Sequence, residues 1–279
     1  IDSRYDACAF ADFDHDGRLD LYVNGTITGG ASWQDSLFRN TGSSFVDVTP
    51  APIRKLQADH GVQWADVDGD GDLDLYVGTY KVKNVLDAYP PQARVFDQVV
   101  KKVGGKYVVA DAWKTEYRVV DRPDLGGVMR SQRADPDLFF INDGKGHFTR
   151  TPISGARFIG VDGNPLSEEP DYFTLAARFY DVNGDGFNDV VTSLQAHGWG
   201  LAWFEQKRDA GGTISFVQHM IMDDHTTKNA GGVTCTQLHG STSADVDGDG
   251  IPDFIVGKRY WSHLDDFYDP DPYGPPVLY

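Results

Sequence analysis

Short apolar stretches flank an acidic loop at four places in the chain. The loops begin at Asp12, Asp66, Asp181 and Asp245, and each leads into a largely apolar, β-branched or aromatic stretch such as Leu-Tyr-Val or Phe-Ile-Val. Such stretches are typical of strands, and so are the segments that precede the loops. The sequence therefore repeats a unit of strand, acidic loop and strand, and this self-similarity governs the fold prediction.

The repeated loop has the form Asp-x-Asp/Asn-x-Asp-Gly-x-x-Asp. Carboxylates at alternate positions of a tight loop converge on one point, and hard oxygen ligands of this kind suit calcium. An EF-hand would need a glutamate at loop position twelve and a helix afterwards, but that position holds Val23, Val77, Thr192 and Val256. We therefore expect about four structural Ca2+ sites. The candidate ligands are Asp12, Asp14, Asp16 and Asp20; Asp66, Asp68, Asp70 and Asp74; Asp181, Asn183, Asp185 and Asp189; and Asp245, Asp247, Asp249 and Asp253.

This pattern resembles the FG-GAP/VCBS repeats of calcium-binding β-propellers, such as the heads of integrin α-subunits. The resemblance implies an all-β fold of four-stranded antiparallel blades, with calcium in the loop between the first two strands of each blade. Such propellers usually have seven blades, whereas about four are visible here. An open propeller would expose an apolar blade face, so we expect further blades, domains or another chain to complete the ring.

The remaining strands are spaced unevenly along the single domain of residues 1–279. Third and fourth strands are predicted at 36–40 and 45–48, within 137–149, and at 200–205 and 215–221. The first acids of successive loops are 54, 115 and 64 residues apart (12 to 66, 66 to 181, 181 to 245). Segment 80–135 is therefore either a long insertion or a degenerate blade without a metal loop, and we favour the insertion. Within it, residues 106–109 and 117–120 predict a hairpin.

The composition limits the kinds of binding partner and the cellular locations that are compatible with the sequence. The net charge is −17, and only four of the 42 acidic residues are glutamate, which fits aspartates placed as ligands. The absence of a basic stripe argues against nucleic-acid binding, and no apolar run is long enough for a membrane span. Cys8 and Cys235 make no disulfide framework, and Cys8 is expected in the core. Weak calcium loops fill best in millimolar calcium, so we expect an extracellular, secreted or periplasmic location.

A second candidate site lies at the opposite end of the blades. Residues just before the first strand and just after the second gather there, around the mouth of the central channel. Histidines, cations and aromatic residues of this kind bind sugars, carboxylates or metals, or transfer protons. We call this end the rim, and its candidate residues are His60, His197, His239, Lys258, Arg259, Tyr260, Trp261 and His263.

Residues 196–263 also have a narrower resemblance, to a propeller subgroup that includes the fungal aldos-2-ulose dehydratases. It implies that His197, His239 or His263 abstracts a proton while Lys258 or Arg259 stabilises an enolate. Two functions follow from the sequence. The leading one is an extracellular recognition module that binds glycan or protein through the rim, with His60, Tyr260 and Trp261 as ligand contacts. The alternative is a sugar dehydratase or lyase that uses the same rim.

Overall fold

The acidic loops connect the first two strands of antiparallel sheets in a computed structural model of the chain. The structure describes residues 5–25, 27–28, 31–54, 59–82, 85–122, 127–171, 174, 177–194, 199–223, 229, 232, 234–235, 238–251, 253–258 and 277–278. The first sheet has the order β1 (Tyr5–Ala11), β2 (Asp20–Gly25), β5 (Ser36–Asn40) and β6 (Phe45–Asp47), with the small hairpin β3 (Ile27–Thr28) and β4 (Ala31–Ser32) between β2 and β5. The second sheet comprises β7 (Asp59–Ala65), β8 (Asp74–Thr79), β13 (Leu138–Asn142) and β14 (Phe148–Arg150).

The third and fourth sheets follow the same order with one addition. The third contains β17 (Ala177–Tyr180), β18 (Asp189–Ser193), β19 (Leu201–Arg208) and β20 (Ile214–Met222). Two unpredicted strands, β15 (Gly155–Ile159) and β16 (Pro165–Leu166), extend its outer edge, and β15 runs parallel to β20. Three strands of the fourth sheet are described, namely β21 (Leu238–Ala244), β22 (Asp253–Lys258) and β23 (Val277–Leu278).

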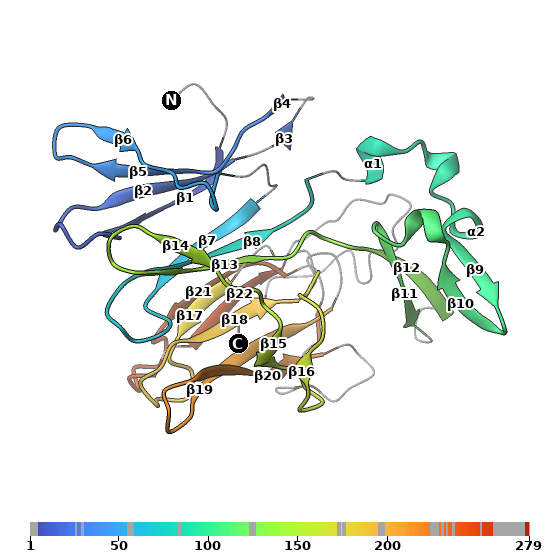
Figure 1. Ribbon diagram of the computed structural model, residues 1–279. Coiled ribbons are helices and arrows are strands. Elements are labelled where there is room, and N and C mark those ends of the chain that lie inside the picture. Colours follow the sequence, from blue (N-terminus) through green and yellow to red (C-terminus); the bar gives the residue numbers. More distant parts are fainter. Residues whose placement is uncertain are drawn as a thin grey trace.

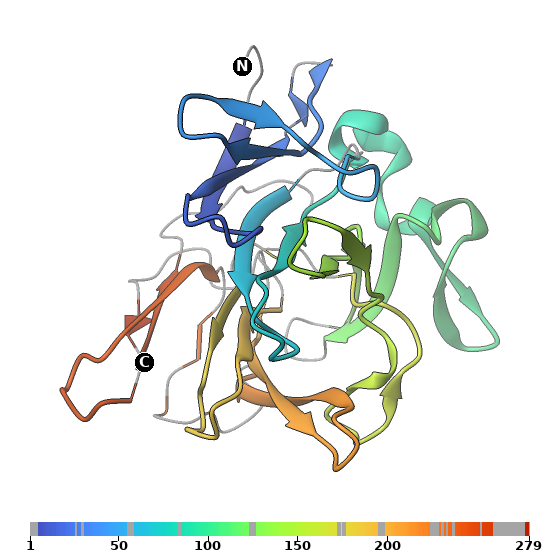
Figure 2. The same cartoon turned by 60° about the vertical axis from the view of Figure 1, so that its left-hand side comes forward.

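The four sheets succeed one another as blades do, with their first strands adjacent (Figures 1 and 2). Strand β7 contacts both β1 and β17, and β17 contacts β21. Alternate side chains of a strand point to opposite neighbours: Leu75 and Val77 of β8 pack toward the first sheet, whereas Tyr76 packs toward the third. The hydrophobic cores therefore lie between successive sheets. The expected all-β propeller-like architecture is confirmed.

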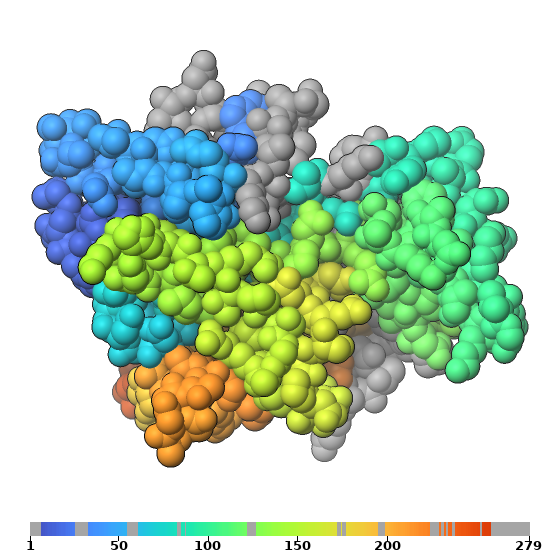
Figure 3. Space-filling model, viewed as in Figure 1, coloured from blue at the N-terminus to red at the C-terminus, as the bar shows by residue number. Residues whose placement is uncertain are grey.

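Segment 80–135 leaves the second sheet after β8 and returns to it at β13, which pairs directly with β8. Its elements are α1 (Val85–Ala88), the 3-10 turn Pro91–Ala93, α2 (Phe96–Val99), β9 (Val100–Val103), β10 (Lys106–Val109), the 3-10 turn Asp111–Trp113, β11 (Tyr117–Arg122) and β12 (Gly127–Gln132). They form a separate lobe beside the sheets, with a small core of its own around Trp113 and Tyr117 (Figures 1 and 3). Among the described residues, no helix is long and apolar enough to span a membrane.

The predicted hairpin between 106–109 and 117–120 is wrong. Strand β10 pairs with β9, and β11 pairs with β12. The reason is the turn at Gly104 and Gly105, where both residues have positive φ, 58° and 86°. Two consecutive residues of this kind favour a tight two-residue hairpin turn, so β10 folds back on the strand just before it.

The expectation for Cys8 is also wrong, because this side chain is exposed. In β1, Ala9 and Ala11 face the core between the first two sheets. Alternation then places Cys8 and Phe10 on the outer face, where Phe10 is 56% exposed. Cys235 is buried, and its Sγ lies 3.9 Å from Met222 Sδ.

Candidate metal centres and the opposite rim

The first aspartate of each loop fixes the loop backbone. Asp12 accepts hydrogen bonds from the amides of Asp16 and Gly17 at 3.0 and 2.9 Å, and Asp66 accepts from Gly69 and Gly71 at 2.6 and 3.0 Å. The same arrangement recurs in the other two loops, where Asp181 accepts from Gly184, Asp185 and Gly186, and Asp245 accepts from Gly248 and Gly250. The backbone amides thus hold each first carboxylate in place. In Asp12, Asp66 and Asp245 each carboxylate oxygen keeps a further lone pair for a cation, whereas Asp181 Oδ1 already accepts two of these hydrogen bonds.

Two loop positions need positive φ. The glycine after the third acid has this conformation in every loop, with φ of 83° at Gly17 and 95° at Gly71. The residue between the second and third acids also has it, and there the first loop uses His15 (φ 57°) where the second uses Gly69. His15 Nε2 lies 2.8 Å from Asp72 Oδ1 of the second loop. The imidazole therefore connects two neighbouring loops, a role that the sequence did not indicate.

The last aspartate of the loop ties the hairpin to the third strand. Asp74 accepts hydrogen bonds from the amide of Val67 in its own loop and from the amide of Asn142 at the end of β13, both at 2.9 Å. Asp20 and Asp189 make the equivalent pairs of bonds to the first and third sheets. These three side chains are buried. These three loops are thus held in their sheets from both ends.

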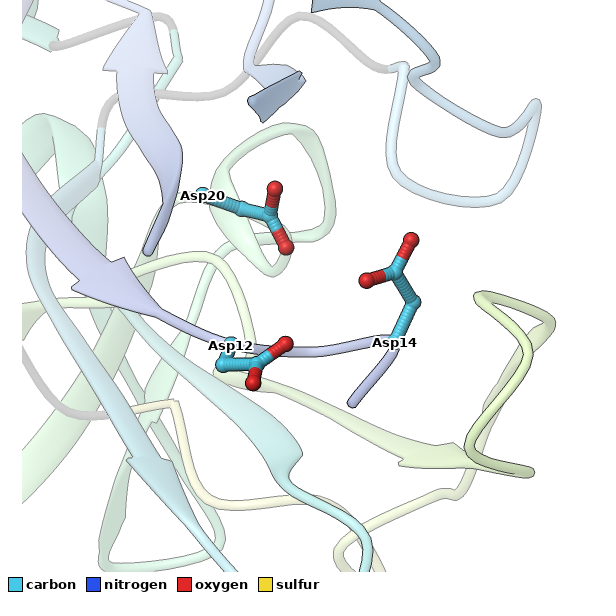
Figure 4. Close-up of side chains that lie close together, drawn as sticks. All are labelled: Asp12, Asp14 and Asp20. Atoms are coloured by element: carbon cyan, nitrogen blue, oxygen red, sulfur yellow. The ribbon is translucent and has the colours of Figure 1, made fainter. Parts of the chain in front are cut away.

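Carboxylates converge in three of the loops. One oxygen from each of three aspartates lies within 4.8 Å of the other two in the sets Asp12, Asp14 and Asp20; Asp66, Asp68 and Asp70; and Asp245, Asp247 and Asp253. Figure 4 shows the first set, in which the three carboxylates face a common space. Asp14 Oδ1 and Asp68 Oδ1 are buried and accept no hydrogen bond within the described part of the chain.

This donor set fits calcium. All the converging atoms are carboxylate oxygens, which are the hard ligands that Ca2+ prefers. A buried carboxylate oxygen without a hydrogen-bond partner is costly, and a cation at the common point would satisfy it. Asp14 still has Oδ1 available, although its Oδ2 forms a salt bridge with Arg39 Nε at 2.7 Å.

The carboxylates repel one another without a cation. Burial raises the pKa of Asp74 to about 7, and it also raises the pKa of Asp20 and Asp189. Burial likewise raises the pKa of Asp68, with a further contribution from the charge of Asp70. A bound divalent cation would reverse this effect, because an opposite charge at this distance favours the ionised form.

The remaining candidate ligands lie in the same loops but outside these three-acid sets. Asp16 is paired with Arg18 instead. In the third loop, the side-chain amide of Asn183 donates to Asp185 Oδ2 at 3.1 Å and to Glu205 Oε1 at 2.9 Å. Its carbonyl oxygen remains the ligand atom that the loop pattern requires, and Glu205 is a nearby carboxylate that the sequence did not indicate. The residues in question are Asp16, Asp74, Asp181, Asn183, Asp185, Asp189 and Asp249.

Three of the rim candidates fall at strand ends opposite the loops. His60 lies near the start of β7, His239 near the start of β21, and Lys258 at the end of β22. In the fourth sheet, Leu238 is paired with Lys258, whereas Ala244 is paired with Asp253 beside the loop. His239 is half-buried. His197, Arg259, Tyr260, Trp261 and His263 lie outside the described residues, so their proposed roles stay predictions.

The first two acidic loops lie in a region that matches the model of a known protein family. Residues 12–77, which span the first two acidic loops, match the FG-GAP-like repeat. The chain carries an FG-GAP-like repeat.

Similar proteins are only distantly related to the chain. It is 25% identical over 201 residues to cartilage acidic protein 1 of Mus musculus and of Homo sapiens, and the match covers 64% of this chain and 29% of each relative. The matched region thus spans less than a third of these relatives. Among solved structures, an Agrocybe aegerita lectin described for specific recognition of non-reducing terminal N-acetylglucosamine aligns with a TM-score of 0.34 and 19% identity, over 98% of this chain and 65% of that one.

Side-chain amides connect the first and second acidic loops to the next sheet. Asn142, at the end of β13, donates to Leu73 O in the acidic loop of the same sheet at 3.1 Å. It also donates to Phe13 O in the acidic loop of the preceding sheet at 2.9 Å. Gln206 in β19 makes the same pair of bonds one sheet later, to Asn188 O at 3.1 Å and Val67 O at 2.8 Å. These residues were not among the candidates predicted from the sequence, although an amide residue at the same place in the third strand was a visible signal.

A buried Tyr–Asp pair recurs near the other end of the first two sheets. The Tyr22 hydroxyl donates to Asp35 Oδ2 at 2.7 Å, and the Tyr76 hydroxyl donates to Asp137 Oδ2. A backbone amide three residues beyond each tyrosine donates to the other carboxylate oxygen at 2.7 Å, from Gly25 and Thr79 respectively. The pair therefore fixes the end of the second strand against the start of the third.

The Asp137 carboxyl should make stability depend on pH. Burial raises the pKa of Asp137 to about 6, against the opposing effect of hydrogen bonds from Thr79, Tyr76 and Thr174. The folded state therefore holds this proton more tightly than the unfolded state, so the contribution to stability is complete below pH 3.8 and is lost as pH rises through about 6. Urea unfolding at constant calcium should show the parent chain losing stability relative to Asp137→Asn across this window. If the difference in unfolding free energy between the parent chain and Asp137→Asn stayed constant with pH, the raised pKa of Asp137 would be contradicted.

Proposed function

We propose that the chain is part of an exported, calcium-stabilised β-propeller that recognises glycan or protein through its rim. The observation that carries the proposal is the convergence of aspartates in the acidic loops, where buried oxygens of Asp14 and Asp68 have no hydrogen-bond partner among the described residues. Calcium, when bound, neutralises these carboxylates and crosslinks the two ends of the loop. The loop backbone amides and the contacts with the third strands hold the aspartate carboxylates in position. Millimolar calcium outside the cytoplasm suits such loops.

The arrangement of the strands supports the rim as the recognition surface. The acidic loops occupy one end of the first-strand hairpins, and their side chains are committed to backbone amides and to the cation. Strand termini from different sheets lie at the opposite end, including those that carry His60, His239 and Lys258. Binding residues commonly lie at such termini, on loops or strand ends that a rigid scaffold positions.

Two histidines at opposite ends of the sheets allow a matched test. His239 lies at the rim, and His15 lies in an acidic loop. We expect His239→Ala to weaken binding to a glycan array by roughly tenfold or more, and His15→Ala to leave it nearly unchanged. Loss of binding with His15→Ala alone would place the recognition surface at the calcium end instead. Assay of His239→Ala on a keto-sugar would separately address the dehydratase or lyase hypothesis, which requires turnover by the parent chain.

A further inference from the structure

The core between the second and third sheets contains a cavity of about 70 Å3. Its walls are almost entirely carbon, and six of the fourteen lining residues are aromatic: Tyr76, Phe139, Phe158, Phe179, Phe204 and Phe216. Water in a cavity needs two to four polar partners, and cavities without them stay dry and take apolar guests such as xenon. The polar lining residues Asp137, Thr174, Thr192 and Ser193 contribute almost none of the wall surface, so the cavity is suited to an apolar occupant.

A comparison with the preceding core explains why this space is unfilled. Between the first two sheets, Trp64 packs edge-on against Tyr22 with ring centroids 6.3 Å apart. Between the second and third, Phe179 packs edge-on against Tyr76 at 6.0 Å. Both tyrosines stand two residues after the last loop aspartate, and Trp64 and Phe179 stand two residues before the first. The cavity thus lies where a phenyl ring replaces the larger indole.

The size and the surroundings of the cavity define the guest. At about 30 Å3 per water-sized group, the space admits roughly two to three heavy atoms. The Asp137 carboxylate at the wall already accepts hydrogen bonds from Tyr76, Thr79 and Thr174. Three other lining residues, Phe179, Val190 and Phe204, are only partly buried. A guest can therefore enter from their side.

We propose that this cavity is a binding site for a small, uncharged aliphatic group of about isopropyl size, carried by a ligand that inserts between the second and third sheets. The site is separate from the acidic loops and includes none of the rim candidates predicted from the sequence, and its test does not depend on the function proposed for them. Removing the apolar group from water supplies the driving force, since the walls offer contacts on several sides.

Xenon is a suitable probe because it binds dry apolar cavities without hydrogen bonds. In a 129Xe chemical-shift titration of the whole chain in calcium, we expect a saturable component that Phe179→Trp weakens by roughly tenfold or more. Phe45→Trp adds the same atoms on the surface, where Phe45 is 46% exposed, and should leave xenon binding unchanged. Val190→Ile provides a smaller filling change if the indole is not accommodated.

Competition tests the chemical class of the guest. Isobutanol should displace xenon from the parent chain, whereas glycerol, which is of similar size but polar, should not. A xenon shift that is linear in the parent chain, or equal in the parent chain and both filling variants, would overturn the proposal. Equal displacement by glycerol would overturn the assignment of an apolar guest.

Discussion

Replacing Asp74 by alanine should lower the free energy of unfolding by roughly 3–5 kcal/mol and remove the calcium dependence of the second loop. The Asp74 side chain is buried and accepts hydrogen bonds from the amides of Val67 and Asn142. Its loss leaves two amides unsatisfied and also deletes a candidate calcium ligand. The measurement is urea unfolding followed by far-UV circular dichroism, in excess calcium and in excess chelator.

Asp72 supplies the matched control within the same loop. Its carboxylate contacts His15 at the surface and belongs to none of the converging sets. Exposed pairs of this kind contribute at most about 1 kcal/mol, so Asp72→Ala should remain close to the parent chain and keep its full response to calcium. If chelator destabilised neither the parent chain nor Asp72→Ala, the structural role of calcium would be wrong. An equal response in Asp74→Ala would remove only Asp74 from the ligand set.

Replacing Asn142 by alanine should cost roughly 2–4 kcal/mol through the loss of its side chain, although the backbone amide that bonds Asp74 is retained. Its side chain is 2% exposed, and its amide bonds the carbonyls of Phe13 and Leu73. Both carbonyls would lose a buried donor, and the first loop would lose its connection to the second sheet. Thermal and urea unfolding in excess calcium measure the effect.

Asn40 occupies the same place in the first sheet and serves as the control. Its amide bonds Leu19 O at 3.0 Å in an exposed setting. The Asn40→Ala change should therefore cost less than Asn142→Ala, at about 1 kcal/mol. Equal losses from the two substitutions would show that the connection between sheets adds nothing to stability.

Local sequence sufficed for the features that are encoded locally. Asp and Gly at fixed spacing specify the loop, and the apolar stretches beside it specify the first two strands, so both could be predicted. The pairing of β15 with β20 could not, because it joins segments far apart in the chain. The exposure of Cys8 depends on which face of β1 meets the next sheet. The partners of Asn142 and the space beside Phe179 likewise depend on residues contributed by another repeat.

The hydrogen bonds from Asn142 and Gln206 to loops of the preceding repeat have a consequence for folding during protein synthesis. The Phe13 carbonyl is bonded by a side chain 129 residues later, and the Val67 carbonyl by one 139 residues later. The first two loops therefore acquire this contact only after the third strand of the following repeat has been translated. Proteins fold from the N-terminus as the chain emerges during synthesis. Because residues 85–132 are translated before Asn142, this lobe delays the contact between Asn142 and the first loop. In a nascent chain that ends before Asn142, the first loop would lack the hydrogen bond from the Asn142 side chain to the Phe13 carbonyl.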